Sequence, residues 1–220
     1  MEHVVKILMK EFVTHDTIRF ITEKPENYNF LPGQATEVSI NQPGWKDKKR
    51  PFTFCSKNSD PVLEFTVKIY PHEGVTEQLS RLKPGDELIV RDVWGTINYK
   101  GLGVFIAGGA GITPFIAILR DLMDKGQAEG NMLLFANKAW KDIILEREFK
   151  EMLGNKAHFI LSREEREGYD SGRIDEDYLK RHIKDFNQNF YLCGPTQFIV
   201  SVKRALDSLG ASPESVVIEV

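Results

Sequence analysis

The hydrophobic pattern of the chain changes near residue 98. Before that point, short runs rich in Val, Ile, Phe and Thr are separated by turn residues, among them Pro32-Gly33 and Pro84-Gly85. Many short strands with such punctuation are typical of an antiparallel barrel or sandwich. A short helix is expected at about Thr76–Leu82, with Thr76 as its N-cap. The expected strands are residues 4–13, 17–22, 35–40, 51–56, 63–70 and 87–93.

Residues 99–220 alternate between strand and helix patterns. This alternation predicts a parallel sheet that helices cover on both faces. We therefore expect two domains: an N-terminal antiparallel β-barrel over residues 1–98 and a C-terminal α/β doubly wound parallel sheet over residues 99–220. The expected strands of the second domain are residues 103–109, 131–137, 157–162, 189–194 and 215–220, and its expected helices are residues 112–125, 142–153, 175–183 and 195–210.

Composition and charge restrict the class of protein. The 220 residues are 41% hydrophobic and 28% charged, which is enough apolar surface for a globular core. With 29 basic and 32 acidic residues the net charge is −3, so a nucleic acid is not an expected partner. Cys55 and Cys193 are too few for a Cys-rich zinc site or a disulfide framework, which favours a reducing cytoplasm. The N-terminus does not have the pattern of a secretion signal.

Two further patterns argue against a membrane span and a metal site. Residues 101–119 carry no charge, but their five glycines and Pro114 predict a strand, a turn and a helix start rather than a helix in lipid. The five histidines, at positions 3, 15, 72, 158 and 182, show no metal-ligand spacing, so no metal site is expected.

A glycine-rich turn between a strand and a helix is a candidate nucleotide site. Its glycines let the backbone approach a ligand closely. The free amides and the dipole of the helix start favour a pyrophosphate. A tight turn without a ligand is the alternative. The turn reads Gly109, Ala110, Gly111, Ile112, Thr113, Pro114.

This turn departs from the ordinary dinucleotide fingerprint, because Pro114 replaces the third glycine. The next strand ends at Asn137 and offers no Asp or Glu for a ribose hydroxyl. The third strand ends at Ser162-Arg163, whose hydroxyl and guanidinium suit a 2′-phosphate, although a solvated arginine is the alternative. The fourth strand ends at Cys193, which parallel topology puts at the same rim as the glycine turn. No base lies near Cys193 in sequence, so a nucleophilic role is not favoured, and a buried apolar cysteine is the alternative.

Three separated segments together resemble the ferredoxin–NADP reductase family. Arg50–Ser56, with the sequence RPFTFCS, is similar to the family's R-x-[YF]-[ST]-x-x-S element. Gly109–Pro114 resembles its pyridine-nucleotide turn, and Cys193-Gly194-Pro195 resembles its C-G-P element. Taken alone, RPFTFCS also fits a plain barrel strand. The resemblance covers nearly the whole chain and implies an FAD-binding barrel followed by an NAD(P)H-binding domain, with the flavin in the cleft between them.

In the first domain the resemblance implies contacts with FAD. Arg50, beside Pro51, would bind a flavin phosphate, and Phe52 would pack on the isoalloxazine ring. Thr53 would hydrogen-bond flavin N5. Strict alternation puts Thr53 on the opposite face from Arg50 and Phe52, so a twist or bulge is expected in this strand. Two further segments would contact the flavin chain and its diphosphate: Val67, Lys68 and Ile69, and Gly74, Val75 and Thr76.

In the second domain the resemblance implies contacts with NAD(P)H. Thr113 would contact the nicotinamide end, and Cys193 would lie near the reactive carbon as a neighbour that sets shape. Ser162-Arg163 resembles the segment that holds the 2′-phosphate, which favours NADPH over NADH. Plant-type members end in Glu-Val-Tyr, whereas this chain ends in Glu219 and Val220. Glu219 would help proton movement, with a plain surface carboxylate as the alternative, and the missing aromatic predicts a more open flavin face.

The implied activity is that of an FAD-dependent NAD(P)H oxidoreductase that passes electrons to a separate one-electron acceptor such as flavodoxin or ferredoxin. Such carriers are acidic, and a loop with four cations would dock one, unless it is a solvated turn. No iron–sulfur cysteine set is present, so a stand-alone reductase is expected. Two alternatives remain open: a reductase subunit of a larger electron-transfer complex, and a non-catalytic flavin- or nucleotide-binding module. The cations of the loop are Lys46, Lys48, Lys49 and Arg50.

Overall fold

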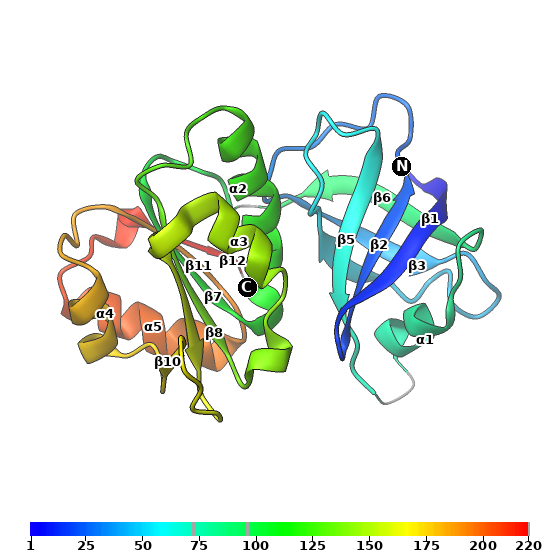
Figure 1. Ribbon diagram of the computed structural model, residues 1–220. Helices are drawn as coiled ribbons and strands as arrows, with labels where there is room; N and C mark the ends of the chain where they lie inside the picture. The colour runs from blue at the N-terminus through cyan, green and yellow to red at the C-terminus, as the bar shows by residue number, and fades with distance from the viewer. Residues whose placement is uncertain (72–73, 96, 220) are drawn as a thin grey trace. The chain divides into compact units, whose positions relative to one another are not determined.

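The computed structural model describes residues 1–71, 74–95 and 97–219, and the chain divides into two units (Figure 1). Unit 1 contains Met1–Thr96 and Thr113–Asp121, and unit 2 contains Ile97–Ile112 and Leu122–Val220. Unit 1 holds an antiparallel sheet and unit 2 a parallel one, which confirms the predicted fold class. The division into domains of residues 1–98 and 99–220 stays a prediction.

Unit 1 is built on a six-stranded antiparallel sheet whose strand order is β4-β3-β6-β1-β2-β5. The two edge strands are linked where the N–H of Cys55, just after β4, donates to the carbonyl of Glu64 in β5 at 2.8 Å. The sheet thereby curls around a single hydrophobic core that includes Phe20, Phe54 and Phe65. The strands are β1 (His3–Thr14), β2 (Thr17–Glu23), β3 (Ala35–Ile40), β4 (Arg50–Thr53), β5 (Val62–Lys68) and β6 (Glu87–Trp94).

The short helix of unit 1 begins earlier than predicted. Helix α1 spans Val75–Arg81 and has Gly74 as its N-cap, so the expectation that Thr76 caps it is wrong. The hydroxyl of Thr76 instead accepts a hydrogen bond from the N–H of Tyr70 at 3.1 Å. The Thr76 hydroxyl thus binds the segment before the helix. The N-cap residue is Gly74, which has no side chain to accept a hydrogen bond from the first turn.

A buried carboxylate ties β2, β5 and helix α2 (Thr113–Asp124) together within unit 1. The Glu64 side chain is 5% exposed, and its two oxygens each lie 2.8 Å from a guanidinium nitrogen, one of Arg19 and one of Arg120. Arg120 lies in the part of α2 that belongs to unit 1, and it also donates to the carbonyl of Cys55 at 2.8 Å. Burying a carboxylate is costly unless it is paired, so the two arginines are what allow Glu64 to be buried here.

Unit 2 is built on a six-stranded parallel sheet with the order β10-β9-β8-β7-β11-β12. The chain runs outward from β7 to β10 and then returns to the other side of β7 with β11 and β12. The carboxyl ends of β7 and β11 therefore form a topological switch point, where open α/β sheets bind ligands. The strands are β7 (Gly103–Gly108), β8 (Met132–Asn137), β9 (Ala157–Leu161), β10 (Asp170–Ser171), β11 (Asn189–Cys193) and β12 (Val216–Glu219).

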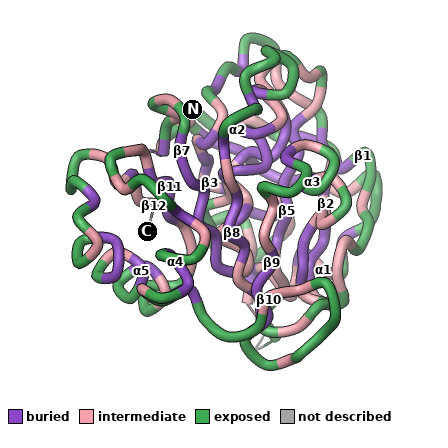
Figure 2. Tube along the Cα trace, turned by 60° about the vertical axis from the view of Figure 1, so that its left-hand side comes forward, coloured by how far each residue is buried: buried purple, intermediate pink, exposed green. Residues whose placement is uncertain are grey.

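Helices cover both faces of the parallel sheet. Helices α4 and α5 contact each other and pack on one face, over Ile106 and Leu134. Helix α3 lies on the other face, where Phe149 meets Phe135 edge-on with ring centroids 6.2 Å apart. This arrangement confirms the predicted doubly wound sheet, and Figure 2 shows that buried positions run through most of its strands. The three helices are α3 (Glu146–Leu153), α4 (Glu176–His182) and α5 (Thr196–Ser208).

Two local features of unit 2 differ from the sequence-based expectation. The two-residue strand β10 pairs with β9 in a segment that has no apolar run to reveal it. The helix expected over residues 142–153 starts only at Glu146, after Leu145 with a φ of 51°. The residues before it form a separate 3₁₀ turn, because the Asp142 carboxylate accepts a hydrogen bond from the N–H of Ala139 at 2.9 Å.

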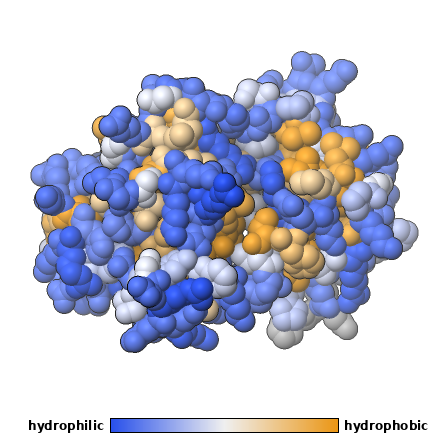
Figure 3. Space-filling model, viewed as in Figure 1, coloured by the Kyte–Doolittle hydropathy of each residue, from blue (hydrophilic) through white to orange (hydrophobic). Residues whose placement is uncertain are grey.

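The described helices are all too short or too polar to cross a membrane. Exposed hydrophobic side chains occur on β1 of unit 1 at Leu8, Met9 and Phe12, beside the exposed Glu11. Figure 3 shows hydrophobic groups interrupted by hydrophilic ones on the visible side of each unit.

Candidate functional site

Two backbone segments of unit 2 approach each other closely at its topological switch point. An added Cβ on Gly111 would stand 2.4 Å from the carbonyl oxygen of Cys193 and 2.5 Å from the nitrogen of Gly194. On Gly194 itself a Cβ would stand 2.7 Å from the ring of Phe198. Gly111 and Cys193 are 82 positions apart in the sequence. The glycine turn nevertheless lies against the Cys193-Gly194 segment, as predicted, and the two together are called the glycine rim.

The turn itself, Gly109–Ile112, is a 3₁₀ turn that leads directly into α2 at Thr113. Gly109 has a φ of +53°, a conformation that glycine adopts at no steric cost. A Cβ on Gly109 would meet nothing within 4 Å, so this part of the backbone faces open space. A ligand can therefore reach the backbone at Gly109, whereas at Gly111 the direction that a Cβ would take is filled by Cys193 and Gly194.

Asn137, at the carboxyl end of β8, is a buried amide that the sequence analysis did not count as a site residue. It is 6% exposed, and within the described part of the chain neither its Oδ1 nor its Nδ2 has a hydrogen-bond partner. The pairing of Gly108 with Ala136 puts Asn137 beside the start of the glycine turn. A buried amide without partners costs about 1–3 kcal/mol. The signal in the sequence is a polar residue that ends an otherwise apolar strand.

The predicted 2′-phosphate segment follows β9 at the same edge of the sheet. Ser162 and Arg163 are both exposed. Their N–H groups donate to the carbonyls of Asn137 and Lys138 at 2.9 Å each, so the ends of β8 and β9 are held together. The Arg163 side chain is thus available to an anion beside the orphaned amide.

Cys193 is half-buried and pairs with Ala107 on one side and with Glu219 on the other. The predicted proton-transfer role of Glu219 concerns its side chain, which lies outside the described residues, as does Val220. Pro195 takes the N-cap position of α5. The geometry brings Cys193 to the rim, while its proximity to a reactive carbon stays a prediction.

In unit 1 the predicted flavin strand β4 has an exposed end and a packed end. Arg50 and Pro51 are exposed, and Phe52 and Thr53 are half-buried. The Phe52 ring packs against the core, with its centroid 6.5 Å from that of Phe65. The pairing of β3 with β4 runs without a register shift, so the bulge expected there does not interrupt this ladder. The register shift of β3 lies instead on its other side, toward β6.

The hydrogen bonds of β5 show which of Val67, Lys68 and Ile69 has backbone N–H and C=O groups directed away from β2. Val67 pairs with Ile18 of β2, and the N–H of Ile69 donates to the carbonyl of Asp16, so both are turned toward β2. Backbone groups alternate in direction along a strand, and those of Glu64 face the opposite edge through Cys55. Lys68 therefore has its backbone groups on that outer edge, whereas its Nζ lies 2.6 Å from the Asp16 carboxylate.

Cys55 belongs to the structural part of unit 1. Its thiol is fully buried, and burial, followed by the nearby Glu64 carboxylate, raises the pKa of Cys55 to about 12. The neighbouring Ser56 is also buried, and its hydroxyl accepts a hydrogen bond from the N–H of Glu64 at 3.0 Å. The second half of the RPFTFCS segment thus fastens β5, and a thiol with such a pKa is not a nucleophile at neutral pH.

Comparison with known proteins covers both halves of the chain. Residues 4–99 match the oxidoreductase FAD-binding domain, and residues 105–204 match the oxidoreductase NAD-binding domain. NADH-cytochrome b5 reductase 1 of Aspergillus oryzae is 29% identical over 91% of this chain and 76% of its own length. The protein of the same name from Bos taurus is 29% identical over 97% of this chain and 84% of its own.

A solved structure shares the fold. The ferredoxin NADP⁺ reductase from Neisseria gonorrhoeae, with bound FAD and NADP, superposes with a TM-score of 0.88 at 17% identity, over 99% of this chain and 98% of that one.

The crowding at Gly111 gives a direct test of the rim. Gly111→Ala should destabilise the protein by about 1–3 kcal/mol, because the new methyl group collides with backbone atoms that cannot rotate away. Thermal unfolding measures this, and Gly74→Ala is the matched control, since a Cβ there meets nothing within 4 Å. Equal melting temperatures for the two variants would contradict the close approach.

Proposed function

The chain belongs to the ferredoxin–NADP reductase-like family of FAD- and NAD-binding oxidoreductases, and from that premise we propose that it oxidises a nicotinamide dinucleotide and passes the electrons through FAD to a separate carrier protein. The observation that carries this proposal is the glycine rim of unit 2, with the orphaned amide of Asn137 beside it. A buried amide without partners, next to an open stretch of backbone, fits a polar ligand better than it fits a purely structural turn.

The residues of unit 1 fit FAD in three respects. Arg50 is exposed and its only described hydrogen bond runs to the carbonyl of Lys49, so its guanidinium has donors left for a phosphate. The half-buried ring of Phe52 offers an apolar face held by the core. The outer edge of β5 at Lys68 offers backbone groups to a planar ring system. When bound, FAD takes up two electrons as hydride and can release them one at a time.

In this proposal Thr53 supplies a hydroxyl to the flavin, and the start of α1 at Gly74, Val75 and Thr76 faces the diphosphate. The Thr76 hydroxyl is already engaged by Tyr70, so its contribution is that of its backbone. Val75 is buried and anchors the segment. The task of these groups is to fix the orientation of the ring, which contributes to the rate by holding donor and acceptor in place.

The backbone amides of the turn Gly109–Ile112 and of the following Thr113 would hold the dinucleotide, and Pro114, which has no N–H, occupies the first turn of α2. Asn137 would satisfy its amide on the ligand, which restores the hydrogen bonds lost by burial. The Cys193-Gly194 backbone closes the other side of the rim against Gly111. In this proposal Cys193 shapes the site through contacts with the ligand, and its thiol forms no covalent bond in the reaction.

We propose NADPH as the preferred coenzyme on the basis of Ser162 and Arg163. A hydroxyl and an exposed guanidinium at one strand end match a 2′-phosphate, and the nearby Lys138 adds a further exposed cation. The names of the relatives above specify NADH. A preference for NADPH would therefore distinguish this chain from them.

The electron carrier that we propose is a small acidic protein. Lys46, Lys48, Lys49 and Arg50 are all exposed on one loop of unit 1, with Lys48 lying 4.2 Å above the Trp45 ring. A cluster of exposed cations raises the encounter rate with an acidic partner. Flavodoxin and ferredoxin fit this description, and the names of the relatives add cytochrome b5 to the carriers to be tested.

Flavin uptake and reduction test the proposed activity. The purified protein should carry or take up one FAD, and anaerobic addition of NADPH should bleach the visible flavin band. Reduction of flavodoxin, ferredoxin or cytochrome b5 should then slow as salt rises above about 0.1 M, where exposed charges are screened. A protein that takes up no FAD would refute the activity. A salt-independent rate with all three carriers would refute only the docking loop.

Coenzyme choice is tested at Arg163. Arg163→Ala should lower kcat/KM for NADPH by about 10- to 150-fold, because a charge-assisted contact is worth roughly 1.5–3 kcal/mol, and should change it for NADH by no more than about twofold. Arg173→Ala removes an exposed arginine elsewhere in unit 2 and serves as the control. Equal losses with both coenzymes would contradict a 2′-phosphate contact.

A further inference from the structure

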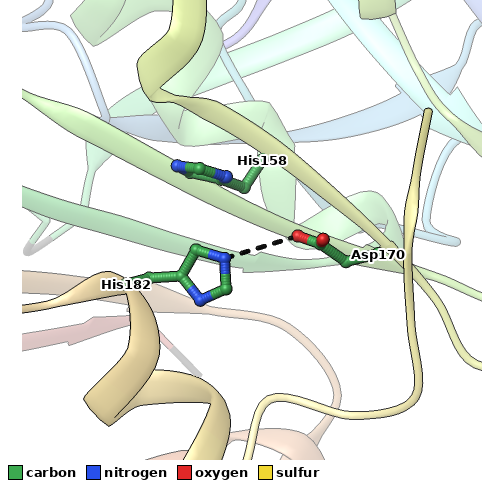
Figure 4. A group of neighbouring side chains, drawn as sticks. All are labelled: His158, Asp170 and His182. Atoms are coloured by element: carbon green, nitrogen blue, oxygen red, sulfur yellow. Dashed lines mark ion pairs between the residues drawn. The ribbon is translucent and has the colours of Figure 1, made fainter.

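A group of three possible metal ligands lies in unit 2 on three different elements. His158 comes from β9, Asp170 from β10 and His182 from the end of α4, and Figure 4 shows their side chains converging. One ligand atom from each residue lies within 4.8 Å of the others. The Nε2 of His182 is 3.6 Å from Oδ2 of Asp170, which is too long for a good hydrogen bond. The three groups therefore face one another without being saturated by one another.

The imidazole ring of His182 is oriented by contacts with Tyr178. Its Nδ1 lies 2.9 Å from the carbonyl oxygen of Tyr178. A carbonyl can only accept, so Nδ1 donates this bond, and Nε2 is the ring nitrogen directed toward Asp170. An Nδ1–H donated to a backbone carbonyl is the usual second-shell arrangement of a metal-ligating histidine. The Tyr178 ring stacks on the imidazole, with centroids 4.1 Å apart, and fixes its plane.

Asp170 is oriented by the same tyrosine. The Tyr178 hydroxyl donates to Oδ2 of Asp170 at 2.6 Å. Tyr178 thus positions one ligand through its backbone carbonyl and a second through its side chain. A hydrogen bond to a ligating carboxylate is again typical of a built metal site.

The group contains one carboxylate and is partly exposed to solvent. Asp170 supplies the negative charge and is 41% exposed on its side chain, so an entry path from solvent exists. His158 is half-buried, and its ring centroid lies 4.7 Å from that of His182. Two cations lie near: Lys156, which acts electrostatically on His158, and Arg181, whose guanidinium carbon lies 5.6 Å from the Tyr178 ring centroid. Neither is paired with Asp170.

We propose that His158, Asp170 and His182 form a binding site for a divalent zinc-class metal ion, with water in the remaining position. Two imidazoles and one carboxylate are a zinc ligand set, with bonds of roughly 2.0–2.2 Å. Such bonds bring ligand atoms about 3.3 Å apart, so small side-chain rotations close the group around the ion. The ion would fasten β10 to β9 and α4. It would thereby anchor the far end of the segment that starts at Ser162.

This site is separate from the glycine rim. His158 lies at the second residue of β9, toward the amino end of that strand, whereas the rim lies at the carboxyl ends of the strands. The metal site therefore stands or falls independently of the proposed reductase activity. It departs from the expectation of no metal site, which rested on spacing along the chain alone.

Calorimetric titration of the chelator-treated full-length protein with Zn²⁺ tests the site. The wild type should bind one equivalent, and the affinity should fall by about 100-fold or more in His158→Gln and His182→Gln. Tyr178→Phe should weaken binding by about 10-fold, because Asp170 loses its orienting bond. His3→Gln, in β1 of unit 1, is the control and should bind as the wild type does.

Asp170→Asn guards against loss of fold, since this side chain is partly exposed and the amide keeps its shape. Zn²⁺ should raise the melting temperature of the wild type and leave that of Asp170→Asn unchanged. The proposal is refuted if the wild type binds no stoichiometric Zn²⁺. It is also refuted if the His158→Gln and His182→Gln variants bind the ion as tightly as the wild type does.

Discussion

The approach of the Gly111 backbone to Cys193 and Gly194 is the constraint on which the nucleotide rim depends. Strands β7 and β11 are neighbours in the sheet, and the chain leaves both at their carboxyl ends in the same direction. Only a residue without a side chain fits where an added Cβ would stand 2.4 Å from a carbonyl oxygen. This contact holds two distant segments as one surface, and it leaves the Gly109 backbone open beside them.

The elements with a strong periodic pattern could be predicted from sequence. Strand β7 is buried along its whole length, so its apolar run identifies it directly. The glycine turn could be predicted too, because clustered glycines indicate a backbone with positive φ angles or close approaches. Its junction with Cys193 followed from parallel topology, which sends the ends of neighbouring strands to one edge.

Features that depend on tertiary contacts could not be read in this way. Threonine is a preferred N-cap residue, but the Thr76 hydroxyl accepts a hydrogen bond from Tyr70, and Gly74 is the N-cap of the helix. Strand β10 has two residues and no pattern of its own. His158 and His182 are separated by 24 positions and meet only because α4 packs beside β9 and β10. Asn137 becomes notable only when its burial and its missing partners are known.

The polar groups of unit 1 and those of unit 2 suit different parts of the proposed function. Unit 1 offers cations and an apolar ring on exposed strand ends, suited to an anionic and aromatic cofactor. Its buried Glu64, flanked by Arg19 and Arg120, keeps the edge at Cys55 in place. Unit 2 offers backbone amides and one unsatisfied side-chain amide. Both sets consist of groups that bind and orient a ligand, which is consistent with a protein that positions redox cofactors.

A crystal structure of the protein with bound oxidised dinucleotide would test the central claim most directly. The account predicts a pyrophosphate on the amides of Gly109–Ile112 and a hydrogen bond between the Asn137 side chain and the ligand. A dinucleotide bound elsewhere on unit 2, with Asn137 still unpaired, would contradict it.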